Sequence, residues 1–90
     1  MRPPSPKSAL AVALRYAEGD KTPVVVASGR GYVGQKIIDI AREHGVPLEQ
    51  NPALAQALST IELDAEIPEE LFKAVAEILG FILRAAKRAA

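Results

Sequence analysis

The sequence predicts a small α/β domain in which a mixed β-sheet of three to four strands is wrapped by three to four helices. Two observations carry this prediction. Residues 22–51 read as strand, tight glycine turn, helix and strand, and residues 68–90 carry apolar side chains at helical spacing. A single strand–helix–strand unit cannot bury both faces of its sheet, so the remaining segments must supply further strands and helices.

The first two strands are predicted near the N-terminus. In Ala9–Tyr16, larger apolar residues alternate with alanines, which suit contact with a closely packed helix. A polar turn at residues 18–21 follows, and the β-branched run Val24–Val26 then begins a second strand. Because the connection is so short, these strands are predicted to form an antiparallel hairpin.

A helix and a third strand are predicted next. The segment Tyr32–His44 has helical spacing of apolar residues. Gly45 stands where a helix needs a left-handed C-terminal residue, and Pro47 prevents its continuation. Residues 46–50 are then predicted to form a short strand. His44, in the last helical turn, is interpreted as a surface or capping residue rather than a base or a metal ligand.

The second half of the chain predicts two more helices. Asn51 and Pro52 have the chemistry of an N-cap and a first helical residue. Residues 62–70 are acidic and irregular, and Pro68 is predicted to start the last helix, with two glutamates in its first turn. Gly80 interrupts the long apolar stripe of that helix, which predicts a close contact at this position.

Length and composition indicate one domain over residues 8–90, after a proline-rich lead-in at residues 1–7 that we expect to be flexible. Apolar residues make up 49% of the chain but aromatic residues only 4%, so the predicted core is aliphatic. The chain has no cysteine, which excludes disulfides and thiolate metal sites. We expect no metal and no cofactor.

Charge argues against several classes of partner. The chain carries 11 Lys and Arg and 11 Asp and Glu, distributed as a net +3 over residues 1–45 and a net −3 over residues 46–90. Neither half has the basic excess of a nucleic-acid-binding protein. No apolar run approaches the ~20 residues that cross a bilayer, and the N-terminus lacks the apolar centre of a signal peptide. We therefore expect a cytoplasmic protein that neither spans the membrane nor binds nucleic acid.

One motif supports an alternative function. Gly29, Gly31 and Gly34 match the glycine spacing of a dinucleotide-binding turn, and Glu49 follows at the distance of a ribose-binding carboxylate. On this alternative the chain is a small nucleotide-binding module that uses the loop Gly29–Gly34. Against it, the chain is too short for the parallel sheet that such a site requires. The structural interpretation is a strand-to-helix turn in which Gly29 supplies an unusual backbone angle.

Three stretches of the chain carry a resemblance to a known family. They are AVALRY with the following PVVVASG, then KIIDIAREHGVPLEQNPALAQAL, then IELDAEIPEELFKAVAEILGFI. Over residues 8–84 the chain resembles the cytoplasmic C-terminal domain of the FlhB/YscU family, the switch proteins of flagellar and injectisome type III export. The resemblance implies a small mixed sheet wrapped by helices, and a role in choosing which substrates the export gate accepts.

Members of that family that carry the switch cut themselves at Asn-Pro-Thr-His, just before the first strand. The asparagine side-chain amide attacks its own carbonyl carbon and releases the nitrogen of proline. Aligned on ALRY, this chain has Pro6, Lys7, Ser8 and Ala9 at the four positions. Because Pro6 replaces the reacting asparagine, we expect no self-cleavage and no enzymatic activity. The resemblance implies a free-standing paralogue (FlhX-type) that already looks like the post-cleavage C-terminal fragment.

The resemblance also implies partners. They are type III export gate proteins, a full-length FlhB-like membrane protein, and export substrates or the hook-length ruler, with a peripheral position at the export apparatus on the inner membrane. Pro23, Ala76 and Leu79 are the candidate partner-binding residues, although Leu79 is as readily interpreted as core. The loop Gly29–Gly34 and the acidic residues 62–66 are second choices. A structural or oligomerisation domain that uses the last helix is a further alternative.

Overall fold

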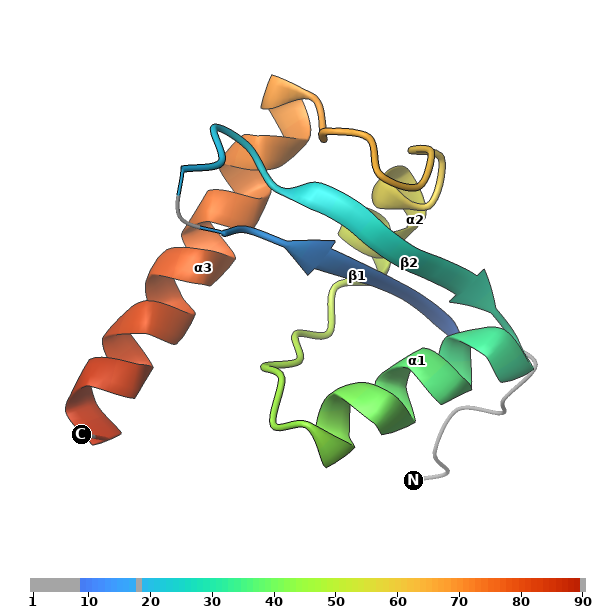
Figure 1. Ribbon diagram of the computed structural model, residues 1–90, viewed down its shortest axis with the longest axis horizontal. Coiled ribbons are helices and arrows are strands. Elements are labelled where there is room, and N and C mark those ends of the chain that lie inside the picture. The colour runs from blue at the N-terminus through green and yellow to red at the C-terminus, as the bar shows by residue number, and fades with distance from the viewer. Residues whose placement is uncertain (1–8, 18, 90) are drawn as a thin grey trace.

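A two-stranded β-hairpin lies between helices on its two faces (Figure 1). The computed structural model describes the backbone of residues 9–17 and 19–89 and the side chains of residues 9–17 and 19–82. Along the chain the elements are β1 (Leu10–Arg15), β2 (Val24–Arg30), α1 (Tyr32–Glu43), α2 (Pro52–Leu58) and α3 (Glu69–Ala89). The resulting α/β domain agrees with the predicted fold class, although its sheet is smaller.

The predicted antiparallel hairpin is confirmed. In its register Ala11 lies opposite Gly29, and the pairing shifts by one residue between Ala13 and Leu14, as in a β-bulge. The alternation along β1 separates two environments. Ala13 faces α1, whereas Val12 and Leu14 pack on the apolar core beneath the opposite face. The small side chain of Ala13 therefore faces α1, as the sequence predicts, although a hollow separates the two at this position.

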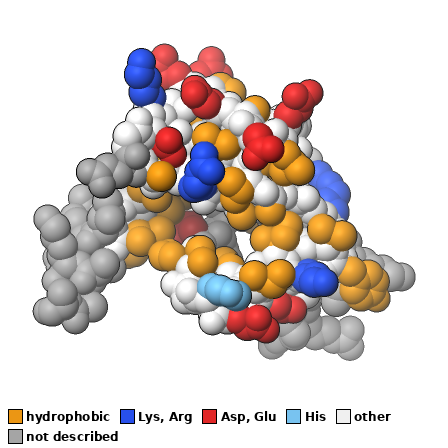
Figure 2. Space-filling model, in the orientation of Figure 1, with side chains coloured by type: hydrophobic (Ala, Val, Ile, Leu, Met, Phe, Trp, Pro, Cys, Tyr) orange, Lys and Arg blue, Asp and Glu red, His pale blue; other side chains and the backbone are white. Residues whose placement is uncertain are grey.

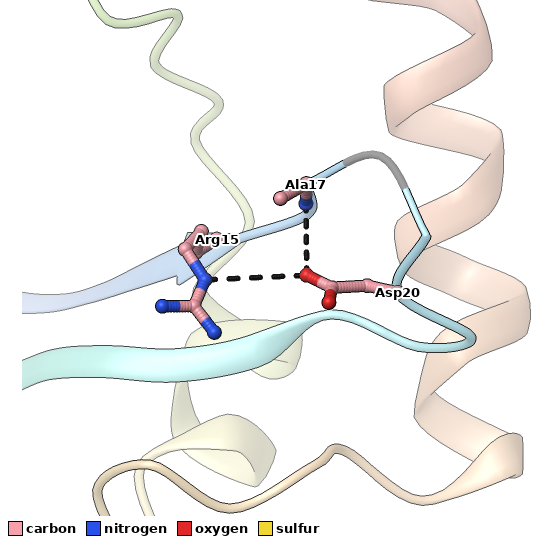
Figure 3. A network of polar contacts seen from close by, with 3 residues as sticks. All are labelled: Arg15, Ala17 and Asp20. Atoms are coloured by element: carbon pink, nitrogen blue, oxygen red, sulfur yellow. Dashed lines mark hydrogen bonds and ion pairs between the residues drawn. The ribbon is translucent and has the colours of Figure 1, made fainter.

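One carboxylate, that of Asp20, makes two polar contacts within the hairpin turn. Asp20 accepts a hydrogen bond from the backbone N–H of Ala17 at 2.9 Å, and its Oδ2 lies 4.0 Å from Arg15 Nε (Figure 3). The Arg15 side chain is 61% exposed. An ion pair this exposed contributes less than about 1 kcal/mol, so the turn depends mainly on its backbone geometry. Gly19, with a φ of 91°, supplies the left-handed residue that closes the turn.

Two predictions about the sheet are wrong. Among the described residues the sheet has two strands rather than three to four, and its pairing is antiparallel rather than mixed. Residues 46–50, predicted as a strand, have no regular secondary structure. The segment that approaches the sheet is instead residues 64–67, within the stretch that reads as acidic and irregular.

The segment 64–67 covers the outer edge of β2. Val24 and Glu66 form an isolated antiparallel bridge. Three backbone hydrogen bonds hold the segment: from Val25 N–H to the Ala65 carbonyl (3.1 Å), from Asp64 N–H to the Val25 carbonyl (2.7 Å), and from Ile67 N–H to the Pro23 carbonyl (3.1 Å). The part of this edge at residues 23–25 is therefore satisfied by the chain itself.

The core is aliphatic, as predicted. Its buried centre consists of residues from β2, α2, α3 and the segment between the two helices: Val25, Leu58, Ile67 and Val75. Leu71 and Phe72 of α3 pack against this cluster, and the Phe72 ring meets the Tyr16 ring edge-to-face with centroids 5.9 Å apart. The contact ties the end of β1 to the first turns of α3.

Helix α1 ends in the predicted glycine motif. Gly45 has a φ of 68° and donates its N–H to the Arg42 carbonyl at 3.2 Å. Val46 donates its N–H to the Ala41 carbonyl at 2.9 Å. These two bonds are those of a Schellman motif, which needs a left-handed residue after the helix. The motif turns the chain away from α1 and into the extended residues 46–50.

Helix α3 begins one residue later than predicted. The Pro68 carbonyl accepts hydrogen bonds from Leu71 N–H (3.0 Å) and Phe72 N–H (2.9 Å), so Pro68 precedes the first helical residue, Glu69. The close contact predicted at Gly80 is wrong, because a Cβ there would meet no described atom within 4 Å.

Helix α2 begins as the sequence predicts, with Asn51 as its N-cap and Pro52 as its first residue. Asn51 Oδ1 accepts a hydrogen bond from Leu54 N–H at 3.1 Å. We expect Asn51→Ala to lower the free energy of unfolding by about 1 kcal/mol, because this N–H loses its partner. Urea denaturation measures the change, and Asn51→Asp, which keeps the acceptor, should restore most of the stability.

Candidate functional site

A groove of about 1170 Å³ lies beside the outer edge of β1. Its opening lies among apolar side chains on the face seen in Figure 2. One wall is α1, another is formed by α2 and α3, and residues 46–52 form the far rim. The apolar side chains that line these walls include Ile37, Ile38, Ala41, Leu54, Leu58, Val75, Ile78, Leu79 and Ile82. The charged residues Arg30, Arg42 and Glu49 also line the groove.

The outer edge of β1 forms the floor of this groove. The Ala9 carbonyl accepts a hydrogen bond from Gly31 N–H at 2.7 Å, so Ala9 and Ala11 face β2. In an antiparallel pair the intervening residues direct their N–H and C=O groups away from the partner strand. Leu10 and Val12 therefore present their backbone groups to the groove. Within the described part of the chain no strand pairs with them.

The far rim of the groove is extended chain with exposed apolar side chains. Residues 46–50 have no strand partner among the described residues, and Val46 and Leu48 are 52% and 47% exposed. The sequence indicates strand character here but cannot show the missing partner. A groove between two unpaired extended segments was the feature that sequence reasoning missed, and the apolar pattern of residues 46–50 was its only signal.

A smaller hollow of about 350 Å³ lies between α1 and the alanine face of the hairpin. Ala13 and Ala27 line it from the strands, and Ile40 and His44 line it from the helix end. His44 is exposed, and its Nδ1 lies 3.0 Å from the Ile40 carbonyl. This position confirms the interpretation of His44 as a surface residue at the helix C-cap.

The three candidate partner-binding residues occupy different environments. Pro23 is fully buried, with less than 2% of its surface exposed, and its carbonyl bonds Ile67 N–H. The Pro23 side chain therefore cannot take part in a surface patch, which corrects that prediction. Leu79 is half-buried, packs against the core cluster and also lines the groove. Ala76 is the exposed member of the three.

The glycine-rich loop has a packing explanation. Gly31, with a φ of 62°, is the N-cap of α1, whereas Gly29 does not have a positive φ. The unusual backbone angle predicted for Gly29 is therefore found two residues later. Gly34 is buried, and a Cβ there would lie 2.7 Å from the Gly29 carbonyl oxygen and 3.0 Å from that of Ala9. These glycines allow the first turn of α1 to touch the hairpin backbone.

The context of a dinucleotide site is not formed by the described residues. Such a site lies at the end of a parallel sheet, with an acidic residue on the strand that follows the helix. Here the sheet is an antiparallel pair, and Glu49 lies in the extended segment after α1. The described residues also contain no group of three His, Cys, Asp or Glu side chains placed to hold a metal ion.

Of the four positions aligned with the self-cleavage motif, Pro6, Lys7 and Ser8 lie outside the described residues. The fourth position, Ala9, lies within the described residues. Its side chain is buried, and its carbonyl accepts a hydrogen bond from Gly31 N–H. As for the membrane, none of the helices within the described residues is long and apolar enough to span it.

Solved structures define the class of protein that has this fold. The structure of the PscU C-terminal domain matches with a TM-score of 0.77 and 32% identity, covering 82% of this chain and 96% of that one. The cytoplasmic domain of FlhB from Shewanella putrefaciens matches with a TM-score of 0.76 and 34% identity, covering 93% of this chain and 78% of that one. The fold is that of the C-terminal cytoplasmic domains of type III export proteins.

The chain belongs to the FlhB HrpN YscU SpaS family, whose model matches residues 7–82. The flagellar biosynthetic protein FlhB of Aquifex aeolicus is 45% identical over 76 residues, which are 82% of this chain and 22% of that protein. The uncharacterized protein YlqH of Bacillus subtilis is 43% identical over 75 residues, covering 82% of this chain and 81% of YlqH. The chain thus spans about a fifth of the FlhB protein that it matches.

Proposed function

We propose that the chain is a non-enzymatic component or modulator of the bacterial flagellar or type III export apparatus. On this proposal it acts like the post-cleavage C-terminal fragment of the switch protein and binds export gate proteins, a full-length FlhB-like membrane protein, or export substrates and the hook-length ruler. The observation that best supports this proposal is that nearly the whole described domain matches the cytoplasmic domains of this family in sequence and fold. Its place would be cytoplasmic, at the export apparatus on the inner membrane.

The proposal requires no self-cleavage. Asparagine cyclisation needs the side-chain amide, and the aligned position is Pro6. We expect the intact mass of the purified full chain to stay unchanged after days at 37 °C. A cut between Pro6 and Lys7 would contradict this prediction. As a positive control, a switch protein with the Asn-Pro-Thr-His motif should be cleaved under the same conditions.

An affinity pull-down from a lysate of the source organism, analysed by mass spectrometry, tests the proposal. Recovery of export gate proteins, the hook-length ruler, or rod and hook subunits would support it. Recovery of none of them, with the full-length switch protein detected in the lysate, would contradict it.

A variant pair tests the exposed face of α3. We expect Ala76→Glu to reduce recovery of these proteins about tenfold, because a carboxylate buried in an interface without a partner must lose its water. The matched control is Ala53→Glu, on the exposed first turn of α2, which should leave recovery unchanged. Both variants should keep the wild-type Tm, since both alanines are exposed. Equal recovery with both would remove Ala76 from the binding surface.

A further inference from the structure

We propose that the outer edge of β2 is a dimer interface, at which the chain pairs with a second copy of itself about a two-fold axis. The two hairpins then form one four-stranded antiparallel sheet. A two-stranded hairpin is marginally stable in water, and an unpaired edge accepts a further strand. Three features carry the inference: the free backbone groups at the end of β2, the register that the covering segment allows, and the opposite charges at the two ends of this edge.

The free part of the edge is the second half of β2. The segment that covers this edge bonds only residues 23–25. Because Gly31 donates its N–H to the Ala9 carbonyl, every second residue back from Gly31 faces β1. Ser28 and Arg30 lie between those residues and therefore direct their N–H and C=O groups outward. No strand pairs with them within the part of the chain that the structure describes.

Antiparallel pairing about a two-fold axis allows one full register along this edge. Outward-facing residues of two antiparallel strands lie opposite each other and exchange both hydrogen bonds. With Gly29 on the axis, Ser28 of each copy lies opposite Arg30 of the other, which gives two such pairs. Pairing the two copies of Arg30 with each other would form only one pair and would place like charges together.

The covering segment excludes the remaining register. Its last bond to β2 is donated by the N–H of Asp64. If each Ser28 paired with the Ser28 of the other copy, Arg30 would lie opposite Val26 and would collide with this segment. In the proposed register the position opposite Val26 is two residues beyond Arg30. The chain has left the strand there, because Gly31, with a φ of 62°, turns it into α1 (Figure 1).

Opposite charges mark the two ends of the free edge, and they favour a second copy as the partner. Arg30 is exposed at one end, and Asp64 and Glu66 are exposed at the other. Two-fold pairing brings the unlike ends together twice. In the proposed register Asp64 lies about 7 Å beyond the other copy's Arg30 along the line of β2, within reach of the arginine side chain. A second copy supplies the matching strand direction and the matching charges by symmetry.

Exposed apolar side chains adjoin the same edge. Tyr32 and Val33 begin α1 directly after β2 and are 72% and 59% exposed. The Val33 side chain lies over Gly29, since a Cβ on that glycine would overlap it. With Gly29 on the axis, the two Val33 side chains lie close to each other across it. The dimer therefore removes from water an apolar surface that the single domain leaves exposed.

The oligomeric state of the full chain is the first test. Because the paired edge is short, we expect a weak dimer, with a Kd of roughly 0.1–1 mM. Sedimentation from about 0.02 to 2 mM measures it. Over this range amide hydrogen exchange at Ser28 and Arg30 should slow at least about twofold. Exchange at Leu10 and Val12, on the opposite edge of the hairpin, should not change. A monomer throughout, or protection of Leu10 and Val12 instead, would overturn the proposal.

A charge exchange tests the register. Arg30→Glu and Asp64→Lys each place like charges together twice, so each variant alone should dimerise about tenfold more weakly. An equal mixture of the two variants restores an unlike pair at both sites and should recover the wild-type Kd. Arg42→Glu, which reverses an exposed charge elsewhere on the chain, is the matched control and should leave the Kd unchanged. A mixture no stronger than its components would overturn the proposal.

One further variant protects this test against misfolding. Asp64 has a φ of 67°, which lysine adopts less readily than aspartate or asparagine. If circular dichroism shows that Asp64→Lys does not fold, Asp64→Asn takes its place. This variant keeps the backbone but removes the charge, so it should weaken dimerisation about threefold. An unchanged Kd for Asp64→Asn would then overturn the proposal.

Discussion

Leu58→Ala should lower the free energy of unfolding by about 2–5 kcal/mol. Leu58 is 4% exposed and lies on α2, where it packs with Val25, Ile67 and Val75 in the buried cluster. Truncation removes apolar contacts from three other segments at once and leaves a cavity. Because a domain of this length is stabilised by roughly 0.05–0.15 kcal/mol per residue, the variant should be close to its unfolding limit.

Leu63→Ala is the matched control for that substitution. Leu63 is 60% exposed, so the same truncation should change stability by no more than about 0.5 kcal/mol. Urea denaturation followed by far-UV circular dichroism compares the two midpoints. Similar losses for both variants would mean that the cluster around Leu58 is not the core of the domain.

The parts of the fold that could be predicted are those encoded within a few residues. The hairpin follows from two apolar runs joined by a short polar turn. The end of α1 follows from Gly45, and the start of α2 from Asn51 and Pro52. At both helix ends the hydrogen bonds that fix the feature connect residues three to five positions apart, so local chemistry decides the outcome.

The segment that pairs with the outer edge of β2 could not be predicted in the same way. Residues 46–50 have suitable side chains, but strand propensity says only that a segment fits a pleated, half-buried surface. The edge of β2 is taken by residues 64–67, about forty positions along the chain, through backbone hydrogen bonds that do not depend on apolar side chains. Such long-range pairing leaves little trace in the acidic sequence of that segment.

In the candidate site too, features fixed by contiguous sequence could be predicted, whereas features that depend on long-range contacts could not. Family membership could be predicted, because its motifs are contiguous stretches of sequence. The groove could not, because it arises where β1, α1, α3 and the extended rim come together. Pro23 illustrates the limit. Its apolar character is evident from the sequence, but its neighbours in the chain do not show that it is buried or that its carbonyl accepts a hydrogen bond from the distant Ile67 N–H.

Gly34→Ala should lower the free energy of unfolding by about 1–3 kcal/mol, although alanine is the better helix former. The added Cβ would lie 2.7 Å from the Gly29 carbonyl oxygen and 3.0 Å from the Ala9 carbonyl oxygen. Both atoms are backbone, so neither can rotate away. Either α1 or the hairpin must shift, which weakens the bond between Gly31 and Ala9.

Gly80→Ala is the control, because Gly80 is also helical and its Cβ would meet no described atom within 4 Å. This substitution should raise stability by about 0.5–1 kcal/mol, since it restricts the unfolded chain and favours the helix. Thermal and urea unfolding should therefore show that the same glycine-to-alanine change lowers stability at position 34 and raises it at position 80. If Gly34→Ala also stabilised the domain, close packing would no longer explain this glycine, and direct titration with NAD or ATP would become the deciding measurement for the loop.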